Sequence, residues 1–278
     1  MTDKRTERDH IQQRAYKDGD ALRTRIRIHR AYTVPPIELP DWVLDQVGWR
    51  GDESVLDIGC GSGEYTEPIR ARLVDGGRLV GIDLSMGMLR ERPTEHLRAA
   101  ADAIHLPFPD ASFDRVFANH LLFFIDDIRA AVREVHRVLR PGGRFVATTN
   151  TRDSLSRFEE TLRDGLVSLG YPDVILPPSV ISRFPLEDGT QFFEGIFSSV
   201  SVHRLDRDLI FEEALPPTDY INSTWASYAH TLPDDLTWKR LMESVHDQIE
   251  GVIAAEGEYR VAKGTGVIVG ERKILPNT

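Results

Sequence analysis

Short apolar runs alternate with stretches of helical spacing between Ser54 and Asn150. The apolar runs predict five strands, at residues 54–59, 78–83, 97–101, 113–119 and 144–149. Between the last two runs, apolar residues recur every three or four positions: Ile128, Ala131, Val132, Val135, Val138 and Leu139. This spacing predicts an amphipathic helix that ends at Pro141-Gly142-Gly143. Strands that alternate with helices predict an α/β fold, with a parallel sheet covered on both faces and right-handed crossovers.

The pattern changes on both sides of this region. Residues 1–40 are polar, helical in character and end in prolines, and residues 41–49 have helical spacing with Asp41 as the expected N-cap. Residues 151–195 contain a helical stretch and a break at Pro177-Pro178, which is typical of an insertion. Strands are expected at 197–213 and 259–271, with helices at about 217–230 and 235–255. We predict an N-terminal helical segment (1–40), a core (41–150) and a C-terminal part (151–278), in which a cover insertion (about 151–195) precedes elements that complete the sheet.

Composition indicates a folded chain. Of 278 residues, 41% are apolar and 28% are charged, which excludes wholesale disorder and fibrous repeats. The net charge of -10 disfavours a polyanion as partner, although residues 1–30 hold an excess of Lys and Arg. The lone Cys60 precludes an intramolecular disulfide, and no metal site is predicted. With neither a secretory signal nor an apolar run of the ~20 residues that span a membrane, we expect a soluble, cytoplasmic protein without membrane association.

A glycine-rich turn follows the first predicted strand, in the sequence VLDIGCGSGEYTEPI at residues 55–69. Its glycines let the backbone approach a ligand at the carboxyl end of the sheet, where open α/β folds bind nucleotides. A dinucleotide fingerprint would need a glycine at Glu64, and the phosphate-binding GxxxxGK[ST] sequence is absent. Asp57 and Glu64 would repel a pyrophosphate and attract an ammonium or sulfonium group. The turn therefore favours a ligand that is cationic at this point.

Two further carboxylates follow the next strands. Asp83 ends the second strand, where a carboxylate can accept both hydroxyls of a ribose. Asp83 could instead cap the following helix, but Ser85 can do this, so we favour the ribose role. Asp102 follows the third strand and could accept a hydrogen bond from an adenine amino group.

These residues together resemble the class I S-adenosylmethionine-dependent methyltransferases, in particular the small-molecule branch that includes methyltransferase type 11 and ubiquinone and menaquinone biosynthesis enzymes. The resemblance covers roughly residues 40–150, through VLDIGCGSG, VGIDLSMGML, ADAIHLPFPDASFD, ANHLLFFIDD and EVHRVLRPGGRF. It implies a Rossmann-like, mostly parallel seven-stranded sheet with helices on both faces. It also implies S-adenosyl-L-methionine as cofactor, with these residues at its site: Asp57, Gly59, Cys60, Gly61, Gly63, Asp83, Leu84, Met88, Asp102, Ala103 and Asn119. Asp83 would hold the ribose, Leu84 and Met88 the adenine face, and Asn119 would lie beneath the sulfonium.

The resemblance makes His120 the candidate catalytic residue, next to the expected methyl group. Methyl transfer is an in-line displacement that depends on alignment, and a base is needed only where the acceptor must lose a proton. His120 could instead pack beneath the following helix. Relatives often carry a second histidine where this chain has Phe124, which favours a less polar acceptor or one already nucleophilic.

Residues 21–32 resemble a lid helix that precedes the core in some relatives. Candidate substrate contacts are Tyr16, Arg23, His29, Tyr32 and Phe124. Arg23 and Arg27 share a helical face, which could bind an acidic group or form surface ion pairs. We expect transfer of a methyl group to an O, N or C atom of a small organic metabolite, by a monomer or homodimer. The alternatives are an RNA or protein methyltransferase recruited through the basic N-terminal arm, and a catalytically silent S-adenosylmethionine-binding protein.

Overall fold

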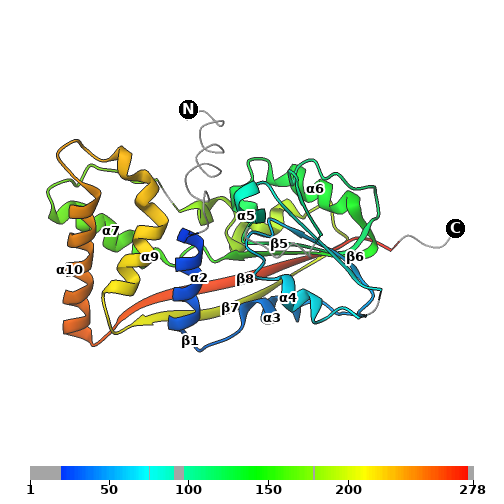
Figure 1. Cartoon of the computed structure of the whole chain (residues 1–278), viewed down its shortest axis with the longest axis horizontal. Coiled ribbons are helices and arrows are strands. Elements are labelled where there is room, and N and C mark those ends of the chain that lie inside the picture. Colours follow the sequence, from blue (N-terminus) through cyan, green and yellow to red (C-terminus); the bar gives the residue numbers. More distant parts are fainter. Residues whose placement is uncertain (1–19, 75, 91–96, 178, 275–278) are drawn as a thin grey trace. The chain divides into compact units, whose positions relative to one another are not determined.

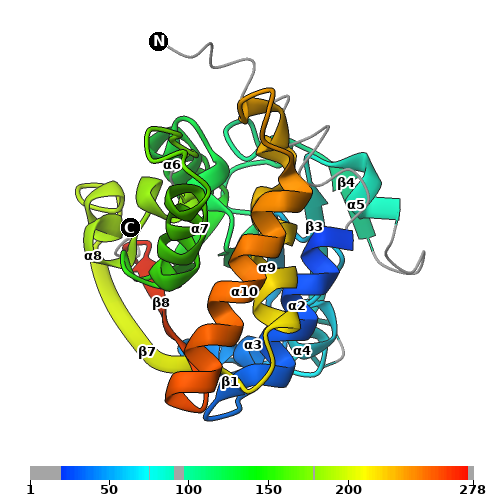
Figure 2. The same ribbon diagram turned by 90° about the vertical axis from the view of Figure 1, so that its left-hand side faces the viewer.

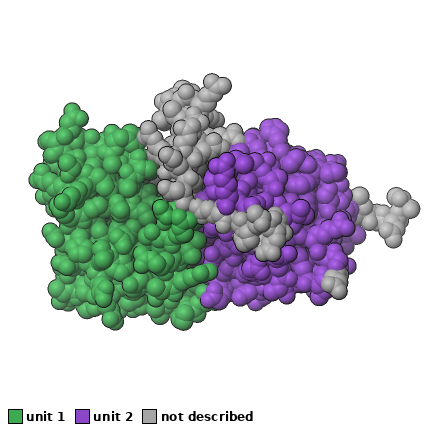
Figure 3. Space-filling model, viewed as in Figure 1, with its two compact units in different colours: residues 1–37, 153–179, 206–264 green, residues 38–152, 180–205, 265–278 purple. Residues whose placement is uncertain are grey.

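The computed structural model describes residues 20–74, 76–90, 97–177 and 179–274. The chain forms two compact units, coloured separately in Figure 3. Unit 1 comprises residues 1–37, 153–179 and 206–264, and unit 2 comprises residues 38–152, 180–205 and 265–278. The predicted cover insertion, about residues 151–195, is divided between them: 153–179 belongs to unit 1 and 180–205 to unit 2.

Unit 2 contains the parallel part of the sheet. Its parallel strands are β2 (Ser54–Ile58), β3 (Arg78–Asp83), β4 (Leu97–Ala100), β5 (Phe113–Asn119) and β6 (Leu139–Asn150). They lie in the order β6-β5-β2-β3-β4, and β8 (Tyr259–Glu271) pairs antiparallel with β6 through residues 265–271. The five predicted strands and the Rossmann-like α/β class are confirmed. Because parallel strands end at one edge, the segments that follow β2, β3, β4 and β5 lie together.

The sheet has one strand more than the seven expected. Among the described residues its order is β1-β7-β8-β6-β5-β2-β3-β4, where β7 is Ser199–Phe211. The additional strand, β1 (Thr33–Val34), pairs antiparallel with β7 at Leu209 and Asp208. Two residues are too few to show an alternating pattern, so the sequence did not reveal this strand. The β8 and β1 pairings make the sheet mixed.

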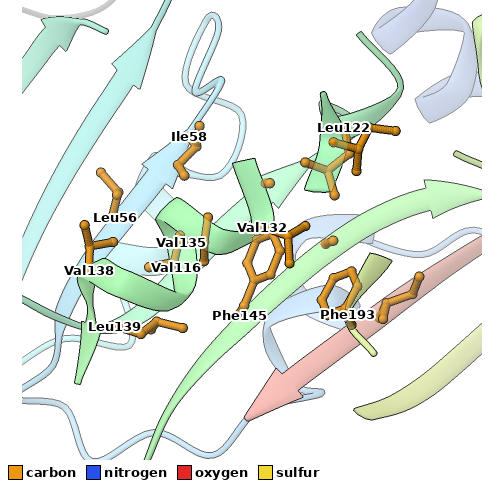
Figure 4. Packing of buried hydrophobic residues seen from close by; sticks show 14 of the residues in the cluster. Leu56, Ile58, Val116, Leu122, Val132, Val135, Val138, Leu139, Phe145 and Phe193 are labelled. Atoms are coloured by element: carbon orange, nitrogen blue, oxygen red, sulfur yellow. The ribbon is translucent and has the colours of Figure 1, made fainter. Parts of the chain in front are cut away.

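Helix α6 (Ile128–Val138) is the amphipathic helix expected from the sequence. The Asp127 side chain caps it by accepting from the Ala130 amide at 2.8 Å. Its buried face packs on the strands, and Figure 4 shows Val132 beside Phe145. The Pro141-Gly142-Gly143 sequence does not lie in a terminating turn, because β6 already begins at Leu139. A register shift between Phe113 and Arg115 of β5 absorbs these residues.

The shorter helical elements of unit 2 connect the strands. They are α3 (Leu39–Leu44), α4 (Thr66–Arg70), α5 (Met86–Arg90), η2 (Leu122–Phe124), η3 (Val180–Arg183), α8 (Leu186–Gly189) and η4 (Thr190–Phe192). Asp41 is not the N-cap of α3: the cap is Glu38, because Pro40 already lies in the first turn, where its missing N–H costs nothing. The Asp41 carboxylate instead accepts from Arg72 Nη1 at 2.9 Å.

Unit 1 is built on helices. They are α2 (Asp20–Tyr32), α7 (Ser156–Ser168), α9 (Leu215–Trp225), η5 (Ala226–Thr231) and α10 (Trp238–Glu256), so the helices expected near 217–230 and 235–255 are confirmed. Figure 1 shows α7, α9 and α10 together at the left, and Figure 2 shows α2, α9 and α10 side by side. Aromatic rings fill the core of this unit, with Phe158 and Tyr220 stacked at 4.5 Å between ring centroids.

Candidate functional site

The glycine turn after β2 is held by hydrogen bonds to the neighbouring strand. The Gly59 and Cys60 amides donate to the Ile82 carbonyl at 2.8 and 3.0 Å, and the Gly63 amide donates to the Cys60 carbonyl at 2.9 Å. Gly59, Gly61 and Gly63 have φ values of +68°, +50° and +90°, in the left-handed region that suits glycine. The turn is therefore a fixed structure at the edge where β2 and β3 end.

Gly59 also has a steric reason to be glycine. A Cβ built on it would lie 2.6 Å from Leu121 Cδ1 and 3.1 Å from Leu121 Cγ. No Cβ is tolerated at such distances without displacement of the leucine. Leu121 follows His120 at the end of β5, so this contact joins two of the loops that meet at the edge.

We expect Gly59→Ala to lower the free energy of unfolding by about 2–4 kcal/mol, which combines a left-handed alanine with an overpacked contact. Gly195→Ala is the matched control, because Gly195 has a similar φ of +73° and no atom within 4 Å of its Cβ position. Urea unfolding should show a clearly larger loss of unfolding free energy for Gly59→Ala than for Gly195→Ala. Adding Leu121→Ala to the Gly59→Ala variant should relieve part of the steric cost of the alanine. Equal losses at Gly59 and Gly195 would refute the steric role of Leu121.

The Asp83 carboxylate joins the glycine turn to the turn after β3. Its Oδ2 accepts from the Gly61 amide at 2.9 Å, and its Oδ1 accepts from the Ser85 amide at 2.7 Å. The Met88 amide donates to Ser85 Oγ at 3.3 Å, so Ser85 caps α5 as expected. Asp83 thus holds two loops while it lies at the carboxyl end of the sheet.

The apolar candidates near Asp83 differ in exposure. Leu84, the residue after Asp83, is 41% exposed although its side chain is large and apolar. Met88 is buried, with 3% exposure. The Met88 Cε lies 3.5 Å from the position of a Cβ on Gly61. Leu84 therefore offers an exposed apolar surface at the end of β3. Met88 packs against the glycine turn at Gly61.

The remaining candidates lie in β2, in the turn after it and after β4. Asp57 and Cys60 are buried, at 2% and 7% exposure. Asp102 Oδ1 accepts from the Ile104 amide at 3.2 Å, and the Asp102 carbonyl accepts from the His105 amide at 3.0 Å. Ala103 is partly buried against the core. Asp102 thus follows β4, the strand next to β3, at the edge where Asp83 ends β3.

Asn119 and His120 end β5, next to Thr148 of β6. Thr148 Oγ1 donates to Asn119 Oδ1 at 2.7 Å, and the His120 amide donates to the Thr148 carbonyl at 3.0 Å. Asn119 Nδ2 is buried without a hydrogen-bond partner among the described residues. His120 has a φ of +50°, which is uncommon for a residue other than glycine. Asn119, whose Nδ2 has no partner among the described residues, is therefore followed directly by a histidine with a positive φ.

Thr148 and Leu121 were not identified from the sequence. Thr148 is opposite Asn119 in the parallel register of β5 and β6, a relation between residues far apart in the chain. Phe124, which stands where relatives often have histidine, packs edge-on against Phe123 with 4.7 Å between ring centroids. It also packs against the buried hydrophobic cluster of unit 2.

The candidates from the N-terminal segment belong to unit 1, apart from Tyr16, which lies outside the described residues. Arg23 forms an ion pair with Asp20, and Arg27 lies 3.9 Å from Asp219. Both arginines of this face therefore lie against acidic side chains, as the ion-pair interpretation expects. His29 contacts Tyr220, with Nε2 3.3 Å from the hydroxyl, and Tyr32 packs on Phe211 at 4.8 Å between ring centroids.

Comparison with known proteins points to one family for the segment that carries this site. Residues 56–147 match the family model described as "Methyltransferase domain". The chain is 35% identical over 123 residues to malonyl-[acyl-carrier protein] O-methyltransferase of Pseudescherichia vulneris, which covers 43% of this chain and 48% of that protein. It is 34% identical over 122 residues to demethylmenaquinone methyltransferase of Symbiobacterium thermophilum, which covers 41% of this chain and 48% of that protein. The matches span about half the length of these relatives.

The fold has counterparts among solved structures. Phosphoethanolamine N-methyltransferase 2 of Haemonchus contortus, in complex with S-adenosyl-L-methionine, aligns with a TM-score of 0.53 at 18% identity, over 96% of this chain and 60% of that one. At that identity the likeness establishes the fold alone. Among the described residues, no helix is both long enough and apolar enough to cross a bilayer.

Proposed function

We propose that this chain, whose residues 56–147 are a methyltransferase domain, transfers the methyl group of S-adenosylmethionine to an O, N or C atom of a small organic metabolite. The matched residues run from β2 into β6 and include the glycine turn, Asp83, Asp102 and the Asn119-His120 pair. The two named relatives act on different acceptors, so their shared segment concerns the methyl donor more than the acceptor.

The observation that carries the proposal is how the turn uses its amides. In a loop that binds pyrophosphate, consecutive backbone N–H groups point at the ligand. Here the Gly59 and Cys60 amides donate to the Ile82 carbonyl, and the Gly61 amide donates to Asp83. Three successive donors are thus committed within the protein, and one of their acceptors is a carboxylate. This arrangement suits a cationic sulfonium better than a phosphate.

Several residues fit the rest of S-adenosylmethionine. Asp83 would accept the ribose hydroxyls, the exposed Leu84 would cover one adenine face, and Asp102 would accept from the adenine amino group. Asn119 Nδ2, a buried donor without a partner among the described residues, would bond to an acceptor atom of the ligand. When bound, S-adenosylmethionine supplies an electrophilic methyl group. The protein aligns the acceptor with it and excludes water.

His120 would act on the acceptor. It directly follows Asn119 at the carboxyl end of β5, and its backbone is fixed by the hydrogen bond to Thr148. For an acceptor with an O–H or N–H group, the imidazole would take the proton that the methyl group replaces. The apolar packing of Phe124 suits an acceptor with an apolar body and one polar reacting atom.

Isothermal titration of the full chain with S-adenosylmethionine tests the proposal. We expect saturable binding below about 1 mM, equivalent to at least ~4 kcal/mol. NAD serves as the control, because it carries the ribose and adenine with a pyrophosphate in place of the sulfonium, and we expect it to bind much more weakly. A folded protein that binds no S-adenosylmethionine at millimolar concentration would exclude the proposed function.

A further inference from the structure

Thr148 of β6 contacts both of the candidate residues at the end of β5. Its side-chain hydroxyl donates to Asn119 Oδ1 at 2.7 Å, and its backbone carbonyl accepts from the His120 amide at 3.0 Å. Thr148 is opposite Asn119 in the register of β5 and β6, and it is fully buried. One buried residue therefore holds both the side chain of Asn119 and the backbone of His120.

The hydrogen bond from Thr148 determines which end of the Asn119 amide is left over. An asparagine amide has an oxygen that accepts and a nitrogen that donates. Thr148 takes the oxygen, and Nδ2 is buried without a hydrogen-bond partner among the described residues. If the amide were reversed, the Thr148 hydroxyl proton would need another acceptor, and this hydroxyl makes no other hydrogen bond in the described part of the chain. Thr148 therefore leaves Asn119 with a donor to present to a ligand.

The strand order indicates which part of S-adenosylmethionine lies near this donor. We assign the ribose to Asp83 at the end of β3 and the adenine to Asp102 after β4. Strand β5 lies on the other side of β2, in the order β5-β2-β3-β4, with neighbouring strands about 4.8 Å apart. A ligand whose nucleoside lies at the ends of β3 and β4 directs its amino-acid end toward β2 and β5. Of the two charged groups at that end, the carboxylate accepts hydrogen bonds and the ammonium only donates them, so Nδ2 suits the carboxylate.

We propose that Thr148 is a positioning residue, which orients the Asn119 amide so that Nδ2 binds the carboxylate at the amino-acid end of S-adenosylmethionine. The assignment rests on the proposed function, because it takes S-adenosylmethionine as the methyl donor. A buried donor without a partner is costly, and the bound carboxylate removes this cost. A hydrogen bond to a charged carboxylate is also stronger than one between neutral groups. Asn119 then fixes one end of the methyl donor directly beside His120.

Isothermal titration of the full chain with S-adenosylmethionine and with its decarboxylated form tests this role. The two ligands differ only in the carboxylate, so the decarboxylated form measures what the rest of the ligand contributes. Thr148→Val removes the hydroxyl and keeps the backbone carbonyl that holds His120. We expect it to bind S-adenosylmethionine about tenfold more weakly than the unaltered protein does, and the decarboxylated form within about twofold. Thr148→Ser keeps a hydroxyl and should bind S-adenosylmethionine as the unaltered protein does.

Thr149→Val is the matched control for the loss of a buried hydroxyl. Thr149 is the next residue of β6, is also fully buried, and donates its hydroxyl to the Phe184 carbonyl at 2.5 Å. Because successive side chains of a strand alternate, it lies on the other face of the sheet. Thr149→Val should lose about as much unfolding free energy in urea as Thr148→Val, yet keep its affinity for S-adenosylmethionine. An equal loss of affinity in the two valine variants would overturn the positioning role.

Asn119→Asp provides a second test if Thr148→Val does not fold. The aspartate still offers an oxygen to Thr148, but it replaces Nδ2 with a second oxygen that repels the ligand carboxylate. Its affinity for S-adenosylmethionine should fall more than about tenfold, while the decarboxylated form should bind at least as tightly as before. If the unaltered protein binds S-adenosylmethionine, then an unchanged affinity in either variant, or equal losses for the two ligands, would overturn the positioning role alone. An unaltered protein that binds no S-adenosylmethionine would overturn the proposed function with it.

Discussion

Replacing His120 by alanine is expected to lower the rate of methyl transfer about a hundredfold, while the affinity for S-adenosylmethionine changes less than about threefold. A positioned general base typically contributes at least that factor to a proton transfer. The imidazole is not among the groups that we expect to hold the methyl donor, which involve Asp83, Leu84 and Asn119 instead. The prediction therefore separates turnover from binding.

The measurement is the initial rate of S-adenosylhomocysteine release, with the acceptor that supports turnover in a panel of small phenols, amines and carboxylic acids. With an acceptor that must lose a proton, His120→Ala should lower this rate at each pH value tested. His230→Ala, which removes a histidine of unit 1, is the control and should leave the rate unchanged. Equal rates for the His120 variant and the unaltered protein across the pH range would remove His120 from the mechanism.

Replacing Asp83 by alanine is expected to weaken S-adenosylmethionine binding at least tenfold. A charged hydrogen bond contributes ~1.5–3 kcal/mol, and the ribose hydroxyls would lose their acceptor. The change also releases the Gly61 and Ser85 amides, which Asp83 now accepts at 2.9 and 2.7 Å. Both effects act in the same direction, because the turn that receives the sulfonium becomes less ordered.

Isothermal titration measures the affinity, and Asp83→Asn separates the two effects. Asparagine still offers one oxygen to a backbone amide but lacks the charge. The affinity of Asp83→Asn for S-adenosylmethionine should therefore lie between that of the unaltered protein and that of Asp83→Ala. Asp173→Ala, which removes an exposed acid of unit 1, should bind S-adenosylmethionine normally. An unchanged affinity in Asp83→Ala would show that the ribose assignment is wrong.

Local patterns were sufficient for most of the core. The glycine spacing after β2, the carboxylate that ends β3 and the helical repeat of α6 each arise from neighbouring residues, and the structure has all three. Boundaries were less accurate where two local signals compete. Pro141-Gly142-Gly143 predicts a turn, yet pairing with β5 extends β6 through it, because a register shift accommodates the surplus residues.

The contacts that complete the candidate sites could not be derived in this way. Thr148 reaches Asn119, and Leu121 covers Gly59, only because separate strands end at one edge of the sheet. No pattern along the chain indicates which side chains will meet there. The same holds for β1, which exists through its pairing with β7.

The sequence by itself determined the α/β class, the glycine turn and the acidic residues that favour a cationic ligand, since these depend on spacing within a few residues. The tertiary structure decided which donors the turn has already committed, and that Asn119 Nδ2 is buried without a hydrogen-bond partner among the described residues. Burial and hydrogen-bond satisfaction are properties of the packed chain, because they depend on residues that are distant in sequence and close in space.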